Sequence, residues 1–245
     1  MKQAAIIIPT TGNSMVEFAV ESALKQTYKN TKVYLIIDGS EHSYKVDRTD
    51  WDLDLDREQR DRLLIYELEE NTGANGQNGH RIYSAMSFLS NADYLFYLDQ
   101  DCWFDENHVE SCIKLLETKD LDWVYSLRKI HSKYAEYLCN DDCESLGMYA
   151  PLFDYQLVDT NCYCIKREVA MLAAPYFVGG WGHDRRYLQV LSTNFKKFDC
   201  TGKYTTNYRL GGDNNLTGAF WETGNAKVAE LYKDKEFPWR KNSEM

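Results

Sequence analysis

The sequence predicts a single α/β domain in which helices flank a mostly parallel β-sheet. An apolar run, a helical pattern and a second apolar run follow one another within about forty residues, which is the order of a βαβ unit. Further short apolar runs end in Gly, Pro or Asp, as buried strands do. A length of 245 residues suits one large domain of this class, alone or with a small appendage.

The composition excludes several classes of protein. Hydrophobic residues make up 44% of the chain and charged residues 27%, as in folded globular proteins. The net charge is -10 and no cluster of Lys and Arg stands out, so we expect no nucleic-acid partner. The apolar runs are too short to cross a bilayer and the N-terminus has no signal-peptide pattern. We therefore predict no integral membrane segment and a cytoplasmic location.

The seven cysteines also indicate a reducing compartment. Their number is odd, and they are scattered along a chain too long for a disulfide scaffold. Four of them could form a zinc site, but their spacings differ from the usual zinc knuckle. These four are Cys139, Cys143, Cys162 and Cys164. We favour ordinary buried thiols.

The first part of the chain alternates strands and helices. Residues 4–8 predict a buried strand that Pro9 stops, and a helix capped by Asn13 or Ser14 follows to about Gln26. Residues 31–37 and 63–68 predict the next two strands. The charged interlude between them, residues 47–62, lacks the Gly and Glu of a calcium loop, so we expect a solvated helix or loop there.

A polar loop at residues 71–79 leads into the next helix. The loop has no Gly-Lys-Ser/Thr ending, and no Gly-x-Gly-x-x-Gly fingerprint follows the first strand. We therefore expect neither a Walker loop nor a dinucleotide cofactor. Residues 80–90 predict a helix with apolar positions at helical spacing. The positions that we assign to its core face are Ile82, Ala85, Met86 and Leu89.

The most informative stretch is residues 94–101, where an aromatic, apolar run ends in two acids. The run predicts a buried strand, and Asp99 and Asp101 follow at its carboxyl end. Ligands of open α/β sheets bind at that edge, and two close carboxylates repel each other unless a cation lies between them. Mg²⁺ and Mn²⁺ prefer oxygen ligands and often carry phosphates. We interpret the pair as a metal site for a diphosphate; the alternative is an ordinary surface turn.

The rest of the pattern is less regular. We expect helices at 106–117, 167–174 and 185–192, and strands at 121–127 and 158–165. Residues 140–147 receive no interpretation, and the tail from residue 201 is expected to wrap the surface. We divide the chain into a domain of residues 1–200 and an extension, residues 201–245, that packs on it. The domain has a nucleotide-binding half at about 1–102 and an acceptor-binding half at about 103–200.

Several short stretches come in a recognisable order. They are the strand with Pro and Thr at 6–10, the helix 21–28, the strand and acidic turn 35–40, Asn-Thr-Gly at 71–73, Asp-Gln-Asp at 99–101, the strand and helix 159–169, and His-Asp at 183–184. In this order they resemble the family-2 glycosyltransferases of the GT-A fold. The resemblance covers roughly residues 4–195 and implies a Rossmann-like sheet and the use of a nucleotide-diphosphate sugar.

The resemblance implies a metal site, a base and a donor site. Asp99 and Asp101 are implied to hold Mn²⁺ or Mg²⁺, and Asp184 to act as general base in a single displacement, hence with inversion. Trp181 and His183 are implied to contact the acceptor. The residues implied to bind the nucleotide sugar are Pro9, Thr10, Thr11, Asp38, Asn71, Gly73, Arg81, Asp99 and Gln100.

Two departures from the family pattern leave alternatives open. The usual arginine after the Gly loop is absent, so Arg81 or His80 would have to replace it, and His183 stands where Glu is common. The implied activity is a hexosyl transfer to a glycan or lipid-linked acceptor, in surface-polysaccharide synthesis of the bacterial type. One alternative is a non-catalytic carbohydrate-binding protein on the same fold. The other is a nucleotidyltransferase that forms the sugar nucleotide.

Overall fold

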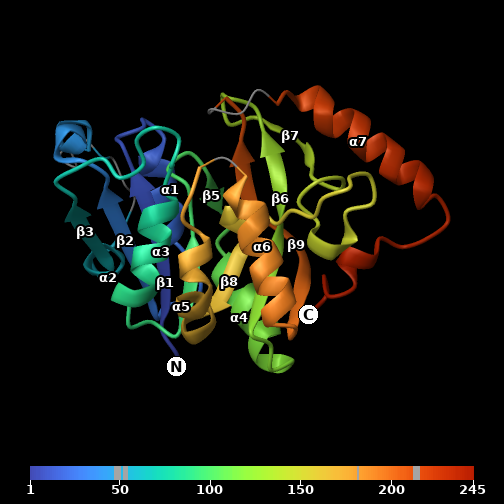
Figure 1. Cartoon of the computed structure of the whole chain (residues 1–245), viewed down its shortest axis with the longest axis horizontal. Coiled ribbons are helices and arrows are strands. Elements are labelled where there is room, and N and C mark those ends of the chain that lie inside the picture. Colours follow the sequence, from blue (N-terminus) through green and yellow to red (C-terminus); the bar gives the residue numbers. More distant parts are fainter. Residues whose placement is uncertain (47–50, 52–54, 181, 212–215) are drawn as a thin grey trace.

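One β-sheet with helices on both faces organises the protein (Figure 1). The computed structural model describes residues 1–46, 51, 55–180, 182–211 and 216–245. The strands are β1 (Ala4–Thr10), β2 (Thr31–Ile37), β3 (Leu63–Glu67), β4 (Tyr94–Tyr97), β5 (Trp103–Phe104), β6 (Trp123–His131), β7 (Tyr137–Asn140), β8 (Tyr163–Lys166) and β9 (Phe198–Arg209). The helices are α1 (Val16–Leu24), α2 (Arg57–Asp61), α3 (His80–Leu89), α4 (His108–Thr118), α5 (Arg167–Ala173), α6 (His183–Asn194) and α7 (Gly218–Leu231).

The strand directions bring several strand ends to one edge of the sheet. The order is β3-β2-β1-β4-β8-β6-β9-β5, and β7 pairs with β6. The four strands β1 to β4 are parallel, whereas β8 is antiparallel to β4 and β6. The carboxyl ends of β1, β2 and β4 therefore share an edge with the amino end of β8. The predicted α/β fold with a mostly parallel sheet in a single domain is confirmed.

Alternating side chains of the sheet build two cores. On β1, Ala5 and Ile7 face the layer that contains α3, α5 and α6, whereas Ala4, Ile6 and Ile8 face α1 and α4. Both faces of β1 are covered, which is why its sequence is apolar throughout rather than alternating. Within the described ranges, no helix has the length and apolarity needed to cross a membrane.

Two local predictions need correction. Pro9 does not end the first strand, because β1 continues to Thr10. The carbonyl of Ile7 accepts from Leu98 on the β4 side and that of Thr10 from Asp38 on the β2 side. The backbone hydrogen-bonding groups of successive strand residues point alternately to the two neighbouring strands, so those of Pro9 point toward β4. The last β1–β4 pair is at Ile7, so the missing N–H of Pro9 removes no hydrogen bond between strands.

The core face of α3 is also rotated from the one we predicted. Ile82 and Met86 are buried, but Ala85 and Leu89 are exposed, Leu89 by 71%. The helix instead turns Tyr83 and Ser87 inward, and the Ser87 hydroxyl donates to the carbonyl of Tyr83. A polar residue that bonds within its own helix can thus occupy a buried position, which apolar periodicity does not reveal.

The prediction that the tail from residue 201 wraps the surface is wrong for its first part. β9 passes through residue 200, lies between β6 and β5, and pairs with both. The division of the chain at residue 200 therefore cuts a strand of the sheet. After it, α7 lies at the end of the molecule opposite β3 (Figure 1). The C-terminal residues are anchored there by Asp142, which accepts from Trp239 Nε1 at 2.9 Å and from Arg240 Nη2 at 2.8 Å.

Gly224→Ala is expected to destabilise the protein although it raises helix propensity. A Cβ at this position of α7 would lie 2.5 Å from Sγ of buried Cys143. Overpacking of this kind typically costs about 1–3 kcal/mol, against a propensity gain of about 1 kcal/mol. Thermal unfolding measures the difference. The control is Gly218→Ala in the same helix, where a Cβ meets only the mobile end of Leu138 at 3.1 Å. Equal melting temperatures for the two variants would contradict this packing argument.

Candidate active site

Four carboxylates lie at one edge of the sheet, and the charge of one of them acts on the other three. Asp99 and Asp101 follow β4, Asp159 precedes β8, and Asp184 lies in the first turn of α6. The charge of Asp159 raises the pKa of each of the other three. We call this group of four the acidic edge. Three of its members were predicted from sequence and are brought together as expected; Asp159 was not predicted.

Asp99 is the most constrained member of the acidic edge. Its carboxylate accepts from Tyr83 OH at 2.8 Å and from Asn161 Nδ2 at 2.9 Å, and its N–H donates to Asn161 Oδ1 at 2.5 Å. Burial raises the pKa of Asp99 to about 7, and the charges of Asp159 and Asp101 add to the rise. Asp99 thus gains a great deal from any positive charge placed beside it.

Asp101 is less tightly held. Its side chain is half-buried, and the weak thiol donor Cys102 donates to its Oδ1 at 3.7 Å. Burial raises the pKa of Asp101, whereas the positive charge of Arg209 on β9 opposes that rise. Its oxygens are therefore better placed than those of Asp99 to accept a new ligand.

Asp184 lies in the first turn of α6, which begins at His183 on the same edge. The preceding Gly182 has a left-handed backbone with φ +85°, which turns the chain into the helix. The N–H of Arg185 donates to Asp184 Oδ1 at 2.7 Å. Burial raises the pKa of Asp184, the Arg185 N–H lowers it, and Asp159 raises it, with a net upward shift. A carboxylate with a raised pKa is the better proton acceptor.

Asp38 holds the polar loop that follows β3. Its Oδ1 accepts from the N–H and hydroxyl of Thr72, at 2.7 and 2.9 Å, and its Oδ2 accepts from the N–H of Gly73 at 2.8 Å. Glycine is required at position 73 because a Cβ there would lie 2.6 Å from the carbonyl oxygen of Asn78. Asn71, at the start of this loop, contacts His42 Nε2 through its Nδ2 at 3.2 Å.

Gln100 ties the loop after β1 to the loop after β4. Its Oε1 accepts from Thr10 Oγ1 at 2.7 Å, from the N–H of Thr11 at 3.0 Å and from the N–H of Asn13 at 3.2 Å. Pro9 packs beside these residues and against Gly79. The side-chain carbonyl of Gln100 is thus engaged within the protein, and its assignment to the donor stays a prediction.

The two candidates for the missing arginine occupy different surroundings. Arg81 is exposed, and its Nη1 donates to the carbonyl of Thr72 at 3.2 Å, next to the loop held by Asp38. His80 is buried, stacks on Phe177 and donates through Nδ1 to the carbonyl of Gly179 at 2.7 Å. Burial lowers the pKa of His80, so it is neutral at pH 7. Of the two, Arg81 has the charge and the position to meet a phosphate.

The two residues predicted to contact the acceptor remain untested. Trp181 lies outside the described residues. His183 begins α6, and its ring lies against Gly179, where a Cβ would come within 2.0 Å of it. Within the described part of the chain, Nδ1 of His183 is buried and has no hydrogen-bond partner.

The acidic edge suits a divalent cation. Asp99 and Asp101 are close, their pKa values are raised by burial, and each is raised further by neighbouring carboxylates. Among the described residues there is no group of three or more His, Cys, Asp or Glu side chains that could hold a metal ion by itself. Mg²⁺ is usually held by only one or two carboxylates, with water and phosphate oxygens completing its shell. The donor set therefore fits an ion that arrives with a diphosphate.

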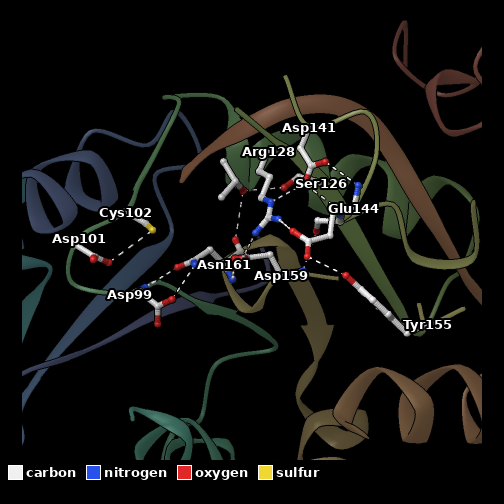
Figure 2. Close-up of polar contacts among 12 residues, drawn as sticks. Asp99, Asp101, Cys102, Ser126, Arg128, Asp141, Glu144, Tyr155, Asp159 and Asn161 are labelled. Atoms are coloured by element: carbon white, nitrogen blue, oxygen red, sulfur yellow. Dashed lines mark hydrogen bonds and ion pairs between the residues drawn. The ribbon is translucent and has the colours of Figure 1, made fainter. Parts of the chain in front are cut away.

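A buried ion cluster that shares Asp159 with the acidic edge was not predicted from the sequence (Figure 2). It consists of Arg128 on β6 with Asp141, Glu144 and Asp159. Two of these acids lie in the segment 140–147 that we could not interpret. Asp159 could have been found only if the direction of β8 had been known. Because β8 is antiparallel to β4, the residues that precede β8 lie at the same edge of the sheet as the residues that follow β4.

The fold is similar to that of crystal structures of S. aureus TarS. TarS 1-349 matches with a TM-score of 0.61 at 12% identity, covering 95% of this chain and 72% of that one. Its complex with UDP-GlcNAc matches with a TM-score of 0.63 at 11% identity, covering 97% and 68%. Another crystal structure of TarS has a TM-score of 0.60 at 11% identity, with 96% of this chain covered and 44% of that one.

Comparison at the sequence level identifies the family. No curated protein matches the chain significantly. Residues 5–137, more than half of the chain, match the family described as Glycosyl transferase family 2. This range contains the motifs from β1 to the Asp-Gln-Asp turn and ends before Asp159 and Asp184. The chain therefore belongs to glycosyl transferase family 2.

Proposed function

We propose that this protein transfers a sugar from a nucleotide-diphosphate sugar to a hydroxyl acceptor, with inversion at the anomeric carbon and with the help of Mn²⁺ or Mg²⁺. The observation that carries the proposal is the acidic edge together with Asp38. Asp38 follows β2 and Asp99 follows β4, with β1 between these strands. Two strand spacings amount to roughly 10 Å, which a nucleoside with its diphosphate can span.

The donor lies along this edge. Its nucleoside end contacts the loops of Pro9 to Thr11 and Asn71 to Gly73, where Asp38 holds the main chain. Arg81 meets the phosphates in place of the usual family arginine. Because TarS has been crystallised with UDP and with UDP-GlcNAc, uridine donors are the first to test.

Asp99 and Asp101 would hold the divalent ion. When bound, such an ion neutralises charge on the departing diphosphate as a Lewis acid. The chain adds Arg209, whose charge already acts on Asp101. Tyr83 and Asn161 orient Asp99 by hydrogen bonds.

Asp184 accepts the proton of the attacking acceptor hydroxyl. Its raised pKa suits a base that must take up a proton during the displacement. A single base and a single displacement invert the anomeric centre. The start of α6, with His183, faces the acceptor, a glycan or lipid-linked sugar of surface-polysaccharide synthesis. We assign acceptor contact to Trp181 as well, from its place in the sequence. The reaction takes place in the cytoplasm.

Metal-dependent binding of a nucleotide sugar tests the proposal. We expect UDP-GlcNAc or another UDP, GDP or dTDP sugar to bind in the presence of Mn²⁺ or Mg²⁺, and EDTA to weaken that binding. Isothermal titration measures affinity, and nucleotide release in the presence of glycan acceptors measures turnover. Asp38→Asn serves as a variant that weakens nucleotide binding with or without metal. Failure of all three nucleotide classes to bind with either metal would refute the assignment, and pyrophosphate release from a nucleoside triphosphate would favour a nucleotidyltransferase.

A further inference from the structure

Arg128 is almost completely buried, at 2% exposure, and contacts three carboxylates (Figure 2). Its Nε donates to Asp141 Oδ2 at 2.8 Å, its Nη2 to Glu144 Oε2 at 2.6 Å and its Nη1 to Asp159 Oδ2 at 2.5 Å. The guanidinium plane also lies over the ring of Tyr208, 4.5 Å from its centroid. Each of the three guanidinium nitrogens thus donates to a different carboxylate, which the planar geometry of Arg permits.

The three carboxylates differ in what else holds them. Asp141 accepts from the N–H groups of residues 143, 144 and 145, at 2.8 to 3.1 Å. Burial alone would raise the pKa of Asp141, but Arg128 and these N–H groups bring it below the ordinary value. Asp141 therefore forms a closed unit with Arg128 and the local main chain. This side of the cluster stabilises the turn, and Asp141 is fully buried.

Asp159 leads in the other direction, toward the donor site. Its Oδ1 accepts from the N–H of Asn161 at 3.0 Å and from Asn161 Nδ2 at 2.7 Å. Asn161 is fully buried. The same Nδ2 donates to Asp99 Oδ2 at 2.9 Å, while Oδ1 accepts from the N–H of Asp99 at 2.5 Å. Both amide hydrogens and the amide oxygen are used, so the orientation of this side chain has no freedom left.

We propose that Arg128 is a positioning residue of the donor site, which acts through Asp159 and Asn161 to fix both the carboxylate and the main chain of Asp99. The chain of contacts is continuous, and Figure 2 shows it running from Arg128 to Asp99. It rests on the proposed function, because only a bound donor and metal give the position of Asp99 a consequence. Arg128 itself does not reach Asp99.

The physical reason for such an arrangement is charge. Asp99 and Asp159 repel each other, and an amide that donates one hydrogen to each holds them at a set separation. The amide can do so only while Asp159 is itself held, and Arg128 holds it. Without Arg128, Asp159 would be a buried carboxylate free to turn toward solvent, and Asn161 would lose the partner that orients it.

The first test uses Asn161→Ala, which changes no charge. We expect it to weaken UDP binding in the presence of Mn²⁺ by roughly 10- to 100-fold, as for other partners of metal ligands, with UDP binding in EDTA unchanged. The second test compares two isosteric variants of the acids around Arg128. Asp159→Asn is expected to cause the same metal-dependent loss. Asp141→Asn, on the closed side, is expected to lower the melting temperature and leave UDP affinity with Mn²⁺ within about twofold.

A double-mutant cycle separates positioning from general stability. Arg128→Lys keeps the positive charge but loses the planar guanidinium that donates to three carboxylates. It is expected to weaken Mn²⁺-dependent UDP binding in the wild-type background, and to have no further effect in the Asn161→Ala background. The proposal is overturned if Asp141→Asn and Asp159→Asn weaken binding equally, or if losses follow melting temperature alone. It also fails if the single variants bind UDP with Mn²⁺ like the wild type. If the wild-type protein itself shows no Mn²⁺-dependent binding of UDP, the proposed function fails first.

Discussion

Asp184→Asn is expected to lower kcat by about 10²- to 10⁴-fold, the contribution typical of a general base. The amide keeps the size of the carboxylate, and its oxygen can still accept from the N–H of Arg185, so the start of α6 is preserved. What the variant loses is the ability to accept a proton. The KM for the donor is expected to change little, because Asp184 does not take part in the contacts of Asp38 or Asp99. Steady-state kinetics with a saturating acceptor measures the effect.

The pH profile of the wild-type enzyme provides an independent check of the same base. The folded-state pKa of Asp184 is raised by burial and by Asp159. The rate should therefore fall as pH drops through a value above the ordinary aspartate pKa of about 3.9, and this acid limb should be missing from the residual activity of Asp184→Asn. The control is Asp154→Asn, at an exposed position of the acceptor half. A wild-type rate for Asp184→Asn would remove Asp184 from the chemistry.

Asp101→Asn is expected to abolish metal-dependent donor binding while the protein stays folded. Loss of a direct metal ligand should exceed the roughly 10- to 100-fold cost of losing one of its partners. Because burial raises the pKa of Asp101, the charged form is disfavoured in the folded protein, and its removal relieves repulsion with Asp99 and Asp159. The melting temperature should therefore be unchanged or higher. The variant should thus lose metal-dependent binding without losing thermal stability.

Titration of UDP with and without Mn²⁺, together with thermal unfolding, measures both effects. Glu106→Gln is the matched control, since it removes an exposed carboxylate shortly after the same turn. It should leave both quantities as they are. If Asp101→Asn retained Mn²⁺-dependent binding of UDP at wild-type affinity, the metal would have to lie elsewhere, and the assignment of the Asp-Gln-Asp turn would be wrong.

The nucleotide-binding half was the part most open to prediction from sequence. Strands β1, β2 and β4 are covered on both faces, so apolar runs mark them clearly, and their parallel arrangement makes the acids that follow them neighbours. The range 31–37 predicted for β2 agrees with the structure. Asp38 and Asp99 were found in this way without knowledge of any side-chain contact.

The second half of the chain was harder to predict because its strands and side chains contact residues from distant parts of the sequence. β9 contains Thr201, Thr205 and Thr206, which are buried. Thr201 accepts from the N–H of Lys203, and the hydroxyls of Thr205 and Thr206 bond to the side chains of His108 and Ser126. A polar strand of this kind has no apolar signature. The role of Arg128 was hidden for the same reason, because its three acids become neighbours only when β6, the segment after β7 and the approach to β8 are assembled.

The position of β9 has a consequence for how the protein is made. Residues 198–209, which form β9, pair with β6 and with β5. In β5, Trp103 pairs with Asn207, which lies about a hundred positions later in the chain. A nascent polypeptide on the ribosome cannot complete this side of the sheet until that late segment has emerged. The βαβ region can form early, whereas the neighbourhood of Asp101 must wait until residues 198–209 have been synthesised. Enzyme competence should thus arise only after residue 209 has emerged, and a chain terminated before β9 should present an open strand edge to chaperones.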